Sequence, residues 1–366
     1  MPEFIPISKP SIARKEIDYV SDAIQSGWVS SLGKYINLFE SKFAKYCSAK
    51  YALTTSSGTT ALHLALLSLD IKSGDEVIIP DLTFIATANA VMYTGATVVT
   101  VDIGEDDYCI CPKAIESAIS KKTKAIIPVH LYGHPSRMTE INNIAKKYNL
   151  FVIEDAAQAH GAEINGEKVG GVGDCAIFSF YGNKIMTSGE GGMITTDDIG
   201  LYERMKHLRD HAMNNEKRYW HDKIGYNYRM TNLQAALGVA QLERINELIQ
   251  QKIEIFNWYH DELKNLSCLK MQSQAEWAKN VRWAVCVEVD GYSENQRNRL
   301  MTILRDRQID SRPYFYPVSD MPMYSTSHTP IAHHVSKQGI CLPSYSGLSK
   351  QYVRRICNEL VDIIAC

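Results

Sequence analysis

A lysine lies in the middle of a glycine-rich segment, "FSFYGNKIMTSGEGGMI", which spans residues 178–194. Lysine is costly to bury, and glycine favours neither a helix nor a strand, so the composition needs an explanation. In a desolvated pocket the pKa of a lysine falls, and its neutral amine becomes a nucleophile able to form a Schiff base. The glycines would permit tight turns and a close approach of a ligand. The alternative interpretation of Lys184 is a solvated surface charge.

A pair of carboxylates ends the apolar stretch "LFVIEDAA", as Glu154 and Asp155. In parallel α/β sheets, ligands bind beyond the carboxyl ends of the strands. A carboxylate at that edge can hold a cation, a metal ion or a protonated ring nitrogen. The alternative is that Asp155 caps a following helix, which aspartate does often.

A possible anion site precedes a helical pattern in "SSGTTALHLA". The first turn of a helix offers unpaired N–H groups and a partial positive charge, and Gly58 would let the backbone approach an anion closely. The segment lacks the lysine of a P-loop and the G-x-G-x-x-G of a dinucleotide fold. The alternative is a plain N-cap, which serine and threonine make routinely.

These three motifs together supply what pyridoxal phosphate requires. The phosphate would bind at the helix start near Gly58, the pyridinium nitrogen would pair with Asp155, and the aldehyde would react with Lys184. The carboxylate would keep the ring nitrogen protonated, so that the ring can withdraw electrons. Phe84, which follows "IIPDLT", could stack on the ring face, although packing in the core is an equal alternative.

Alternating strands and helices between about residues 50 and 200 must position these groups. Near-continuous apolar runs separated by amphipathic helices indicate an α/β fold with a buried, mainly parallel sheet. The runs that predict strands are "DEVIIP", "ATVVTVDI", "KAIIPVHLYG", "LFVIEDAA", "CAIFSF" and "GGMITT".

The pattern changes after residue 230, where residues 230–266 predict one or two long helices. Later strand and helix patterns indicate a smaller α+β domain. We therefore expect two domains: residues 1–249 hold an N-terminal segment and the large cofactor-binding domain, and residues 250–366 form the small C-terminal domain. The first 30 or so residues should join the small domain or cover the entrance to the site.

The composition of the 366-residue chain argues against several function classes. A formal charge of −2 gives no reason to expect a nucleic-acid or membrane partner. We see neither a signal peptide nor an apolar stretch of about 20 residues. Nine scattered cysteines, without a second pair at a zinc-site spacing, indicate free thiols in a reducing cytoplasm and no metal site.

An ordered set of motifs resembles the DegT/DnrJ/EryC1/StrS family of sugar aminotransferases along nearly the whole chain. The motifs are "SGWVSSLGKYINLFE", "SSGTTALHLAL", "GDEVIIP", "VHLYGHP", "IEDAAQAHGA", "SFYGNKIMTSGEGGM", "KRYWHDKIGYNYRMTNLQAALG" and "SRPYFYP". The resemblance implies a fold-type-I transferase of the aspartate aminotransferase kind that depends on pyridoxal phosphate. Some relatives are dehydratases with histidine in place of the lysine, and Lys184 argues against that branch.

The resemblance also implies roles for individual residues. Lys184 would bind the cofactor covalently and move the proton, Asp155 would pair with the pyridinium nitrogen, and Gln158 would lie near the ring hydroxyl. Asn227 would reach the phosphate of the neighbouring subunit, so that a homodimer shares its active sites. The residues implied to hold the phosphate within one subunit are Gly58, Thr59 and Ser179. The residues in segments that line the nucleotide-sugar pocket of relatives are Trp28, Arg229 and Tyr316, for each of which a packing role is an equal alternative.

The implied reaction moves the amino group of L-glutamate to a 4-keto-6-deoxy nucleotide sugar. "KRYWHD", "SRPYFYP" and "LPSYSGL" are most similar to the branch that acts on GDP-4-keto-6-deoxymannose and supplies surface polysaccharide such as O-antigen. Ser57, Gln158 and Tyr181 depart from that branch, so a UDP- or dTDP-linked keto sugar, or a small keto-phosphate, remains an alternative acceptor. A non-catalytic protein that binds pyridoxal phosphate is the remote alternative.

Overall fold

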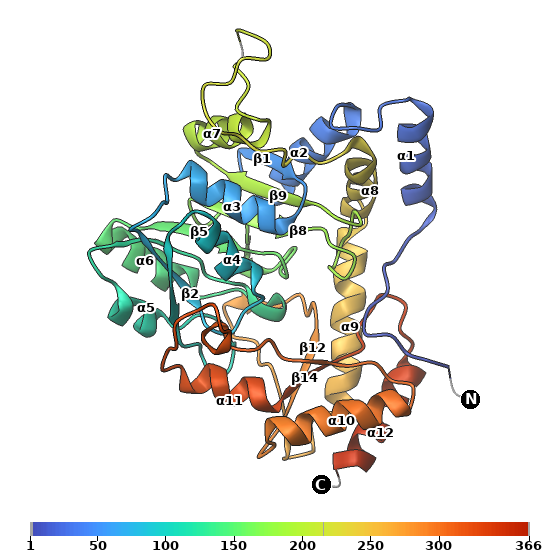
Figure 1. Cartoon of the computed structure of the whole chain (residues 1–366). Coiled ribbons are helices and arrows are strands. Elements are labelled where there is room, and N and C mark those ends of the chain that lie inside the picture. The colour runs from blue at the N-terminus through green and yellow to red at the C-terminus, as the bar shows by residue number, and fades with distance from the viewer. Residues whose placement is uncertain (1–2, 215, 365–366) are drawn as a thin grey trace.

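A mixed seven-stranded sheet forms the centre of the large domain in the computed structural model, which describes residues 3–214 and 216–364 (Figure 1). The strand order is β1-β9-β8-β5-β4-β2-β3. The bounds are β1 Tyr51–Thr55, β2 Glu76–Pro80, β3 Thr97–Val101, β4 Thr123–Ile126, β5 Phe151–Asp155, β8 Cys175–Ser179 and β9 Gly192–Thr196. β9 pairs antiparallel with β1 and β8, whereas β8-β5, β5-β4, β4-β2 and β2-β3 are parallel. The mixed, mostly parallel sheet predicted from the sequence is therefore confirmed.

Helices cover both faces of this sheet, because successive strand side chains point to opposite faces. In β2, Val77 and Ile79 pack into one helical layer, and Ile78 packs into the other. The first layer holds α3 Gly58–Ser68, α4 Ala86–Tyr93 and α7 Ile199–Arg209. The second layer holds α2 Lys34–Tyr46, α5 Pro112–Ala118, α6 Met138–Tyr148 and α8 Asn232–Leu242, and α1 Arg14–Gln25 packs against α8.

The long helical stretch predicted over residues 230–266 consists of two helices, α8 and then α9 (Ile245–Leu263). Figure 1 shows α9 running from the large domain into the small one. Side chains up to Ile249 belong to the core of the large domain, and those from Ile255 onward belong to the core of the small domain. The partly buried side chain of Ile253 also packs against the large-domain core, so the proposed boundary between residues 249 and 250 lies within a continuous helix and does not separate the two cores.

The small domain contains an antiparallel sheet with the order β10-β12-β14-β13. Its elements are β10 Leu269–Met271, β12 Val285–Val289, α10 Glu294–Asp306, β13 Arg312–Pro313, α11 Pro330–Gln338, β14 Gly339–Leu342 and α12 Lys350–Ile364. Near the chain start, Ile5 forms a bridge with Ile309 and is buried in the same core. The first few residues therefore join the small domain, whereas α1 and α2 pack on the large one.

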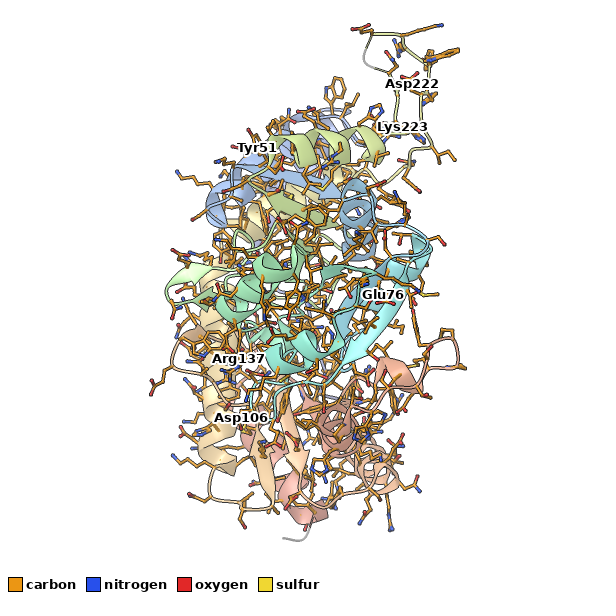
Figure 2. All side chains as sticks on the ribbon, turned by 90° about the vertical axis from the view of Figure 1, so that its left-hand side faces the viewer. Tyr51, Glu76, Asp106, Arg137, Asp222 and Lys223 are labelled. Atoms are coloured by element: carbon orange, nitrogen blue, oxygen red, sulfur yellow. The ribbon has the colours of Figure 1, made fainter. Side chains whose placement is uncertain are left out.

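Smaller elements connect the two domains. A short sheet, β11-β6-β7, pairs the small-domain segment with the large domain. Its bounds are β6 Glu163–Ile164, β7 Glu167–Lys168 and β11 Ala278–Lys279, and the 3-10 turns are η1 Leu131–Gly133 and η2 Val318–Asp320. Figure 2 places Asp106 beside the small domain, where its carboxylate lies 3.9 Å from the Lys270 ammonium.

The thiols and the helices bear on the expected cellular setting. The cysteines that are free are Cys47, Cys109, Cys111, Cys175, Cys286, Cys341 and Cys357. Cys268 is disulfide-bonded, so the prediction of free thiols throughout is wrong at this position. Within the part of the chain that the structure describes, none of the helices has the length and apolar character needed to cross a membrane.

Candidate active site

A cavity of about 350 Å³ lies where β5 and β8 end and α3 begins. This edge carries the carboxyl ends of parallel strands, where ligands of α/β proteins bind. The cavity brings together most of the residues that the sequence nominated for the cofactor. The nominated residues that line it are Gly58, Thr59, Phe84, Asp155, Gln158, Ser179 and Lys184.

Lys184 is held in the connection between β8 and β9. Its N–H donates to the carbonyl of Tyr181 at 3.0 Å, and the connection is closed where the N–H of Phe180 donates to the carbonyl of Gly191 at 2.9 Å. Gly191 has φ +149°, which is strained for any residue with a side chain, so this glycine is required by the turn. Burial lowers the pKa of the Lys184 amine to about 8, although the nearby Asp155 carboxylate raises it. The amine is therefore neutral, and nucleophilic, at mildly alkaline pH.

Trp283 forms one wall of the pocket around this amine. The Lys184 Nζ lies 4.4 Å from the centroid of the indole ring, which is a cation–π distance. The indole N–H donates to the carbonyl of Asn183 at 2.8 Å, next to the lysine in the chain. Trp283 comes from the segment that leads into β12, roughly 100 residues away, and sequence reasoning missed it.

Asp155 ends β5 with its carboxylate buried at the cavity wall. Thr87 of α4 donates its hydroxyl to Asp155 Oδ2 at 2.8 Å, and the N–H of Ala157 donates to Oδ1 at 3.2 Å. Burial raises the pKa of this carboxyl, while these two bonds and Lys184 lower it. A buried carboxylate that faces a cavity is stabilised by a cationic ligand group, such as a protonated ring nitrogen. Thr87 was not nominated from the sequence.

Glu154 supports the same strand end from the opposite side. Its carboxylate accepts N–H bonds from Gly170 at 3.0 Å and Gly173 at 2.8 Å, and it pairs with His130 Nε2 at 3.2 Å. The N–H of Ser136 donates to His130 Nδ1 at 3.0 Å, so Nε2 carries the proton that faces the carboxylate. Burial alone would raise the pKa of Glu154, but His130 and the backbone donors lower it. Glu154 thus fixes the strand end on which Asp155 stands.

The start of α3 provides an anion cradle. Ser57 caps the helix: its hydroxyl accepts from the N–H of Thr60 at 3.1 Å, and its own N–H donates to the Thr60 hydroxyl at 3.0 Å. The N–H groups of Gly58 and Thr59 precede the first hydrogen bond within the helix, so they are available to an anion. A Cβ on Gly58 would lie 2.9 Å from Ser179 Cβ, so only glycine allows this approach of helix and strand.

Gln158 lies at the bottom of the cavity and is buried. Its side-chain oxygen accepts the N–H of Tyr132 at 2.8 Å. The amide NH₂ is therefore the group that Gln158 can offer to a ligand, and an NH₂ donor suits a ring hydroxyl.

Three nominated residues line neither this cavity nor the larger one beside it in the single chain. Asn227 is exposed, and its oxygen accepts from Arg229 Nε at 3.2 Å. Arg229 is also paired with Asp210 at 2.7 Å. Trp28 is 56% exposed, and its carbonyl accepts from the side chain of Asn232 at 2.7 Å. Asn227, Arg229 and Trp28 are thus on the surface and not beside Lys184 of their own chain.

The segment that carries Asn227 is nevertheless fixed to the anion cradle. The carbonyl of Tyr228 accepts the N–H of Ser56 at 2.8 Å, and its hydroxyl lies 3.0 Å from His63 Nδ1 on α3. The rings of Tyr226 and Tyr228 stack at 4.9 Å. These contacts hold residues 226–228 in one conformation, although the neighbouring loop projects from the molecule.

A second, outer cavity of about 760 Å³ adjoins the first, and both are lined by Phe84 and Trp283. Tyr316 lines the outer cavity and not the one that contains Lys184 and the nominated cofactor residues. The buried guanidinium of Arg297 donates to the Tyr316 hydroxyl at 3.2 Å and holds the ring in place. The ring centroids of Phe84 and Phe315 lie 5.8 Å apart, and both residues line both cavities.

The residues present fit pyridoxal phosphate. The close contact between Gly58 and Ser179 leaves a concave backbone surface for the phosphate, and free N–H groups point from the start of α3. Asp155 is a buried carboxylate that a cationic ligand group would stabilise, and Lys184 is an amine with a lowered pKa. All of these groups line one cavity.

Comparison with known proteins identifies the class of protein. The profile of the DegT/DnrJ/EryC1/StrS aminotransferase family matches residues 10–361. The chain belongs to this family, as the sequence motifs predicted.

Two relatives and one solved structure show how close the similarity is. The chain is 45% identical to "GDP-perosamine synthase" of Escherichia coli O157:H7 over 360 residues, which cover 98% of each chain. It is 40% identical to "GDP-perosamine synthase" of Vibrio cholerae over 366 residues, covering 99% of this chain and 100% of the relative. A Streptococcus pneumoniae protein solved in its PLP form has a TM-score of 0.93 at 27% identity, with 98% of both chains covered. The fold-type-I prediction is therefore confirmed.

Proposed function

We propose that this enzyme transfers the amino group of L-glutamate to GDP-4-keto-6-deoxymannose and releases GDP-perosamine. Pyridoxal phosphate is the cofactor. The observation that carries the proposal is the single cavity in which the Lys184 amine, the buried Asp155 carboxylate and the start of α3 meet. The names of the relatives at 45% and 40% identity support this choice of acceptor. The product would supply surface polysaccharide such as O-antigen, and we assign the reaction to the cytoplasm.

The residues of the chain divide the chemistry among them. Bound pyridoxal phosphate supplies an aldehyde for the amine of the substrate and a ring that withdraws electrons from the attached carbon. With the cofactor bound, the Lys184 amine would take the proton from the donor Cα and would deliver it to the C4′ position. With the keto sugar the same amine moves a proton in the reverse direction. Asp155 would hold the protonated ring nitrogen through its buried carboxylate.

We also propose that two chains form a homodimer with shared active sites. An arm next to Asn227 extends away from the body, at the end of the molecule opposite to the small domain, where Figure 2 labels Asp222 and Lys223. Tyr219 on this arm is 75% exposed, and Ile224 is 85% exposed. Apolar side chains of this exposure favour burial against a second copy.

In this dimer the exposed residues complete the partner's site. Asn227 would bind the phosphate there, while Trp28 and Arg229 would line the nucleotide-sugar pocket and Tyr316 would line the pocket of its own chain. Mixing inactive Lys184→Ala and Asn227→Ala chains tests this directly. Hybrid dimers should regain one working site. One of their two sites then combines the intact Lys184 of one chain with the intact Asn227 of the other. Mixtures that stay inactive after verified subunit exchange would contradict shared sites.

The choice of acceptor is tested with a panel of ketones. The enzyme is incubated with L-glutamate and GDP-, UDP- or dTDP-linked 4-keto-6-deoxy sugars, or with small keto-phosphates, and the product mass is measured. We expect the GDP-linked sugar to be aminated at the highest kcat/KM. Preferential amination of another ketone would replace this acceptor, and bound cofactor without amination of any of them would favour a non-catalytic role.

A further inference from the structure

The side-chain amide of Asn183 lies at the wall of the active site with an unpaired polar atom. Asn183 precedes Lys184 in the glycine-rich turn, and it lines both the cavity that contains Lys184 and the outer cavity beside it. The Oδ1 atom of this amide is buried and accepts no hydrogen bond from any residue that the structure describes. The amide therefore has hydrogen-bonding capacity that the folded chain leaves unused.

An unpaired atom at this place is unusual. Burying a polar atom without a partner costs free energy, so each such atom in a native protein calls for an explanation. Of the described residues that have a buried side-chain atom without a hydrogen bond, Asn183 is the one that lines the cavity around Lys184. A ligand in that cavity can supply the missing partner.

The backbone fixes this amide relative to the reacting lysine. The indole N–H of Trp283 donates to the Asn183 carbonyl at 2.8 Å, and the N–H of Lys184 donates to the Tyr181 carbonyl at 3.0 Å. Trp283 and Tyr181 themselves line both cavities. The peptide groups on both sides of Asn183 are thus held in place before a ligand binds.

The chemistry of an amide selects the kind of ligand group. An amide oxygen needs a donor, which the carboxylates of glutamate and the phosphate of the cofactor do not provide. The donor's amine is consumed in the reaction at Lys184, and the ring hydroxyl of the cofactor is assigned to Gln158. A sugar hydroxyl both donates and accepts, so it can pair with the oxygen or with the NH₂ end of the amide.

We propose that the amide of Asn183 binds the C3 hydroxyl of the acceptor sugar, and this inference rests on the proposed amination of a GDP-linked 4-keto-6-deoxy sugar. The keto carbon, C4, must come to the cavity that contains Lys184, and Asn183 lines that cavity as the preceding residue of the chain. The C3 hydroxyl stands on the carbon next to C4, whereas the C2 hydroxyl is one carbon further away. Asn183 is therefore a residue that selects acceptors by their hydroxyl at C3.

The test uses GDP-6-deoxymannose and its 2-deoxy and 3-deoxy forms. All three have a hydroxyl in place of the ketone and cannot be aminated, and their affinities for the holoenzyme are measured by titration calorimetry. We expect the wild type to bind the 3-deoxy sugar about tenfold more weakly than the parent, since leaving a buried polar group unpaired has about this effect. Asn183→Leu should bind the two equally, and its preference for the C2 hydroxyl should stay as in the wild type.

A matched control is available on α9. Asn257→Leu makes the same exchange at an exposed position that lines neither of the two cavities, so it should keep the wild-type preference for the C3 hydroxyl. Asn183→Ala replaces the leucine variant if the latter does not fold or blocks the cavity, and the same loss of preference is expected.

Three outcomes would overturn the proposal. The first is an Asn183→Leu holoenzyme that still binds the 3-deoxy sugar about tenfold more weakly than the parent. The second is a variant that loses its preference at C2 and not at C3, because the amide would then contact the other hydroxyl. The third is weaker binding of pyridoxal phosphate, followed by absorbance, with an unchanged preference among the sugars, because the amide would then serve the cofactor.

Failure of the proposed function gives a different result. A wild-type holoenzyme that binds none of the three GDP-linked sugars would contradict the proposed acceptor, and the assignment of Asn183 with it. A wild-type holoenzyme that binds the parent and the 3-deoxy sugar equally well would contradict only the role of Asn183 and would leave the acceptor in place.

Discussion

Lys184 and Lys252 carry the same amine, but Lys184 is partly exposed to its cavity whereas Lys252 is buried, and their surroundings differ. Burial lowers the pKa of both amines, to about 8 and about 7. Lys184 lies in a glycine-rich turn, near a carboxylate and over the face of an indole ring. Lys252 projects from a regular helix toward the carbonyl and the hydroxyl of Ser344. Burial therefore lowers the pKa of an amine in either place, and the neighbouring groups determine whether the amine reacts or only forms hydrogen bonds.

The groups next to each lysine explain why only one of the two amines is suited to proton transfer. Near Lys184, Asp155 allows the amine to gain or lose a proton at modest cost, which a base and acid require. Near Lys252 the carbonyl and the hydroxyl of Ser344 accept from the ammonium, and neither group exchanges a proton with it near neutral pH. Variants at the two lysines should therefore fail in different ways.

The largest expected effect comes from Lys184→Ala. Both nucleophilic and proton-transfer roles disappear, so kcat for aminotransfer should fall by about 10⁴-fold or more. The measurement of kcat is the rate at which glutamate is converted to 2-oxoglutarate, with the products identified by mass. A Lys184→Ala enzyme that still transaminates would remove the distinction between the two lysines.

The next effect is the pH dependence of cofactor capture. The pKa of Lys184 is lowered to about 8, so below that pH the amine is mostly protonated and unreactive. The rate at which cofactor-free enzyme gains the absorbance of its covalently bound cofactor should rise about tenfold per pH unit up to about pH 8 and then level off. Stopped-flow absorbance follows this change. Lys252→Met is the control, and its capture rate should have the same pH midpoint as the wild type. A capture rate that does not vary between pH 6.5 and 8.5 would contradict the assignment of this step to the Lys184 amine.

The smallest effect concerns Trp283→Leu. The indole face stabilises the protonated amine, and such contacts contribute about 0.5–1 kcal/mol. Losing it should lower the pKa of Lys184 further and move the midpoint of the capture profile down by about half a pH unit. The same stopped-flow series detects this shift. An unchanged or raised midpoint would mean that the ring acts as a wall and not as a partner of the charge.

Where chemistry and local pattern coincide, the sequence nominates residues that the fold brings to one cavity. Asp155 follows an apolar strand, Gly58 precedes a helix, and Lys184 interrupts a glycine-rich turn, so each departs from its local background. The strand and helix order between residues 50 and 200 follows for the same reason, because alternation of apolar runs reflects a buried parallel sheet.

Residues that join the site only through tertiary packing could not be predicted in this way. Thr87, Trp283 and His63 lie in ordinary-looking helix or loop sequence, and their role depends on which distant segments meet. Lys252 occupies a helix with many charged neighbours, where a solvated side chain is the natural expectation. Its burial becomes visible only when the chain start and the loop at Ser344 close over the helix.

That closure sets an order of events during biosynthesis. The N–H of Ile7 donates to the carboxylate of Asp310, 303 positions away along the chain. Most of the polypeptide must therefore leave the ribosome before the wall of the outer cavity that includes Ile7 and Ser8 can form, because contacts of such large sequence separation form late. The large domain can fold before this wall exists, so the outer cavity is completed only when translation is nearly finished.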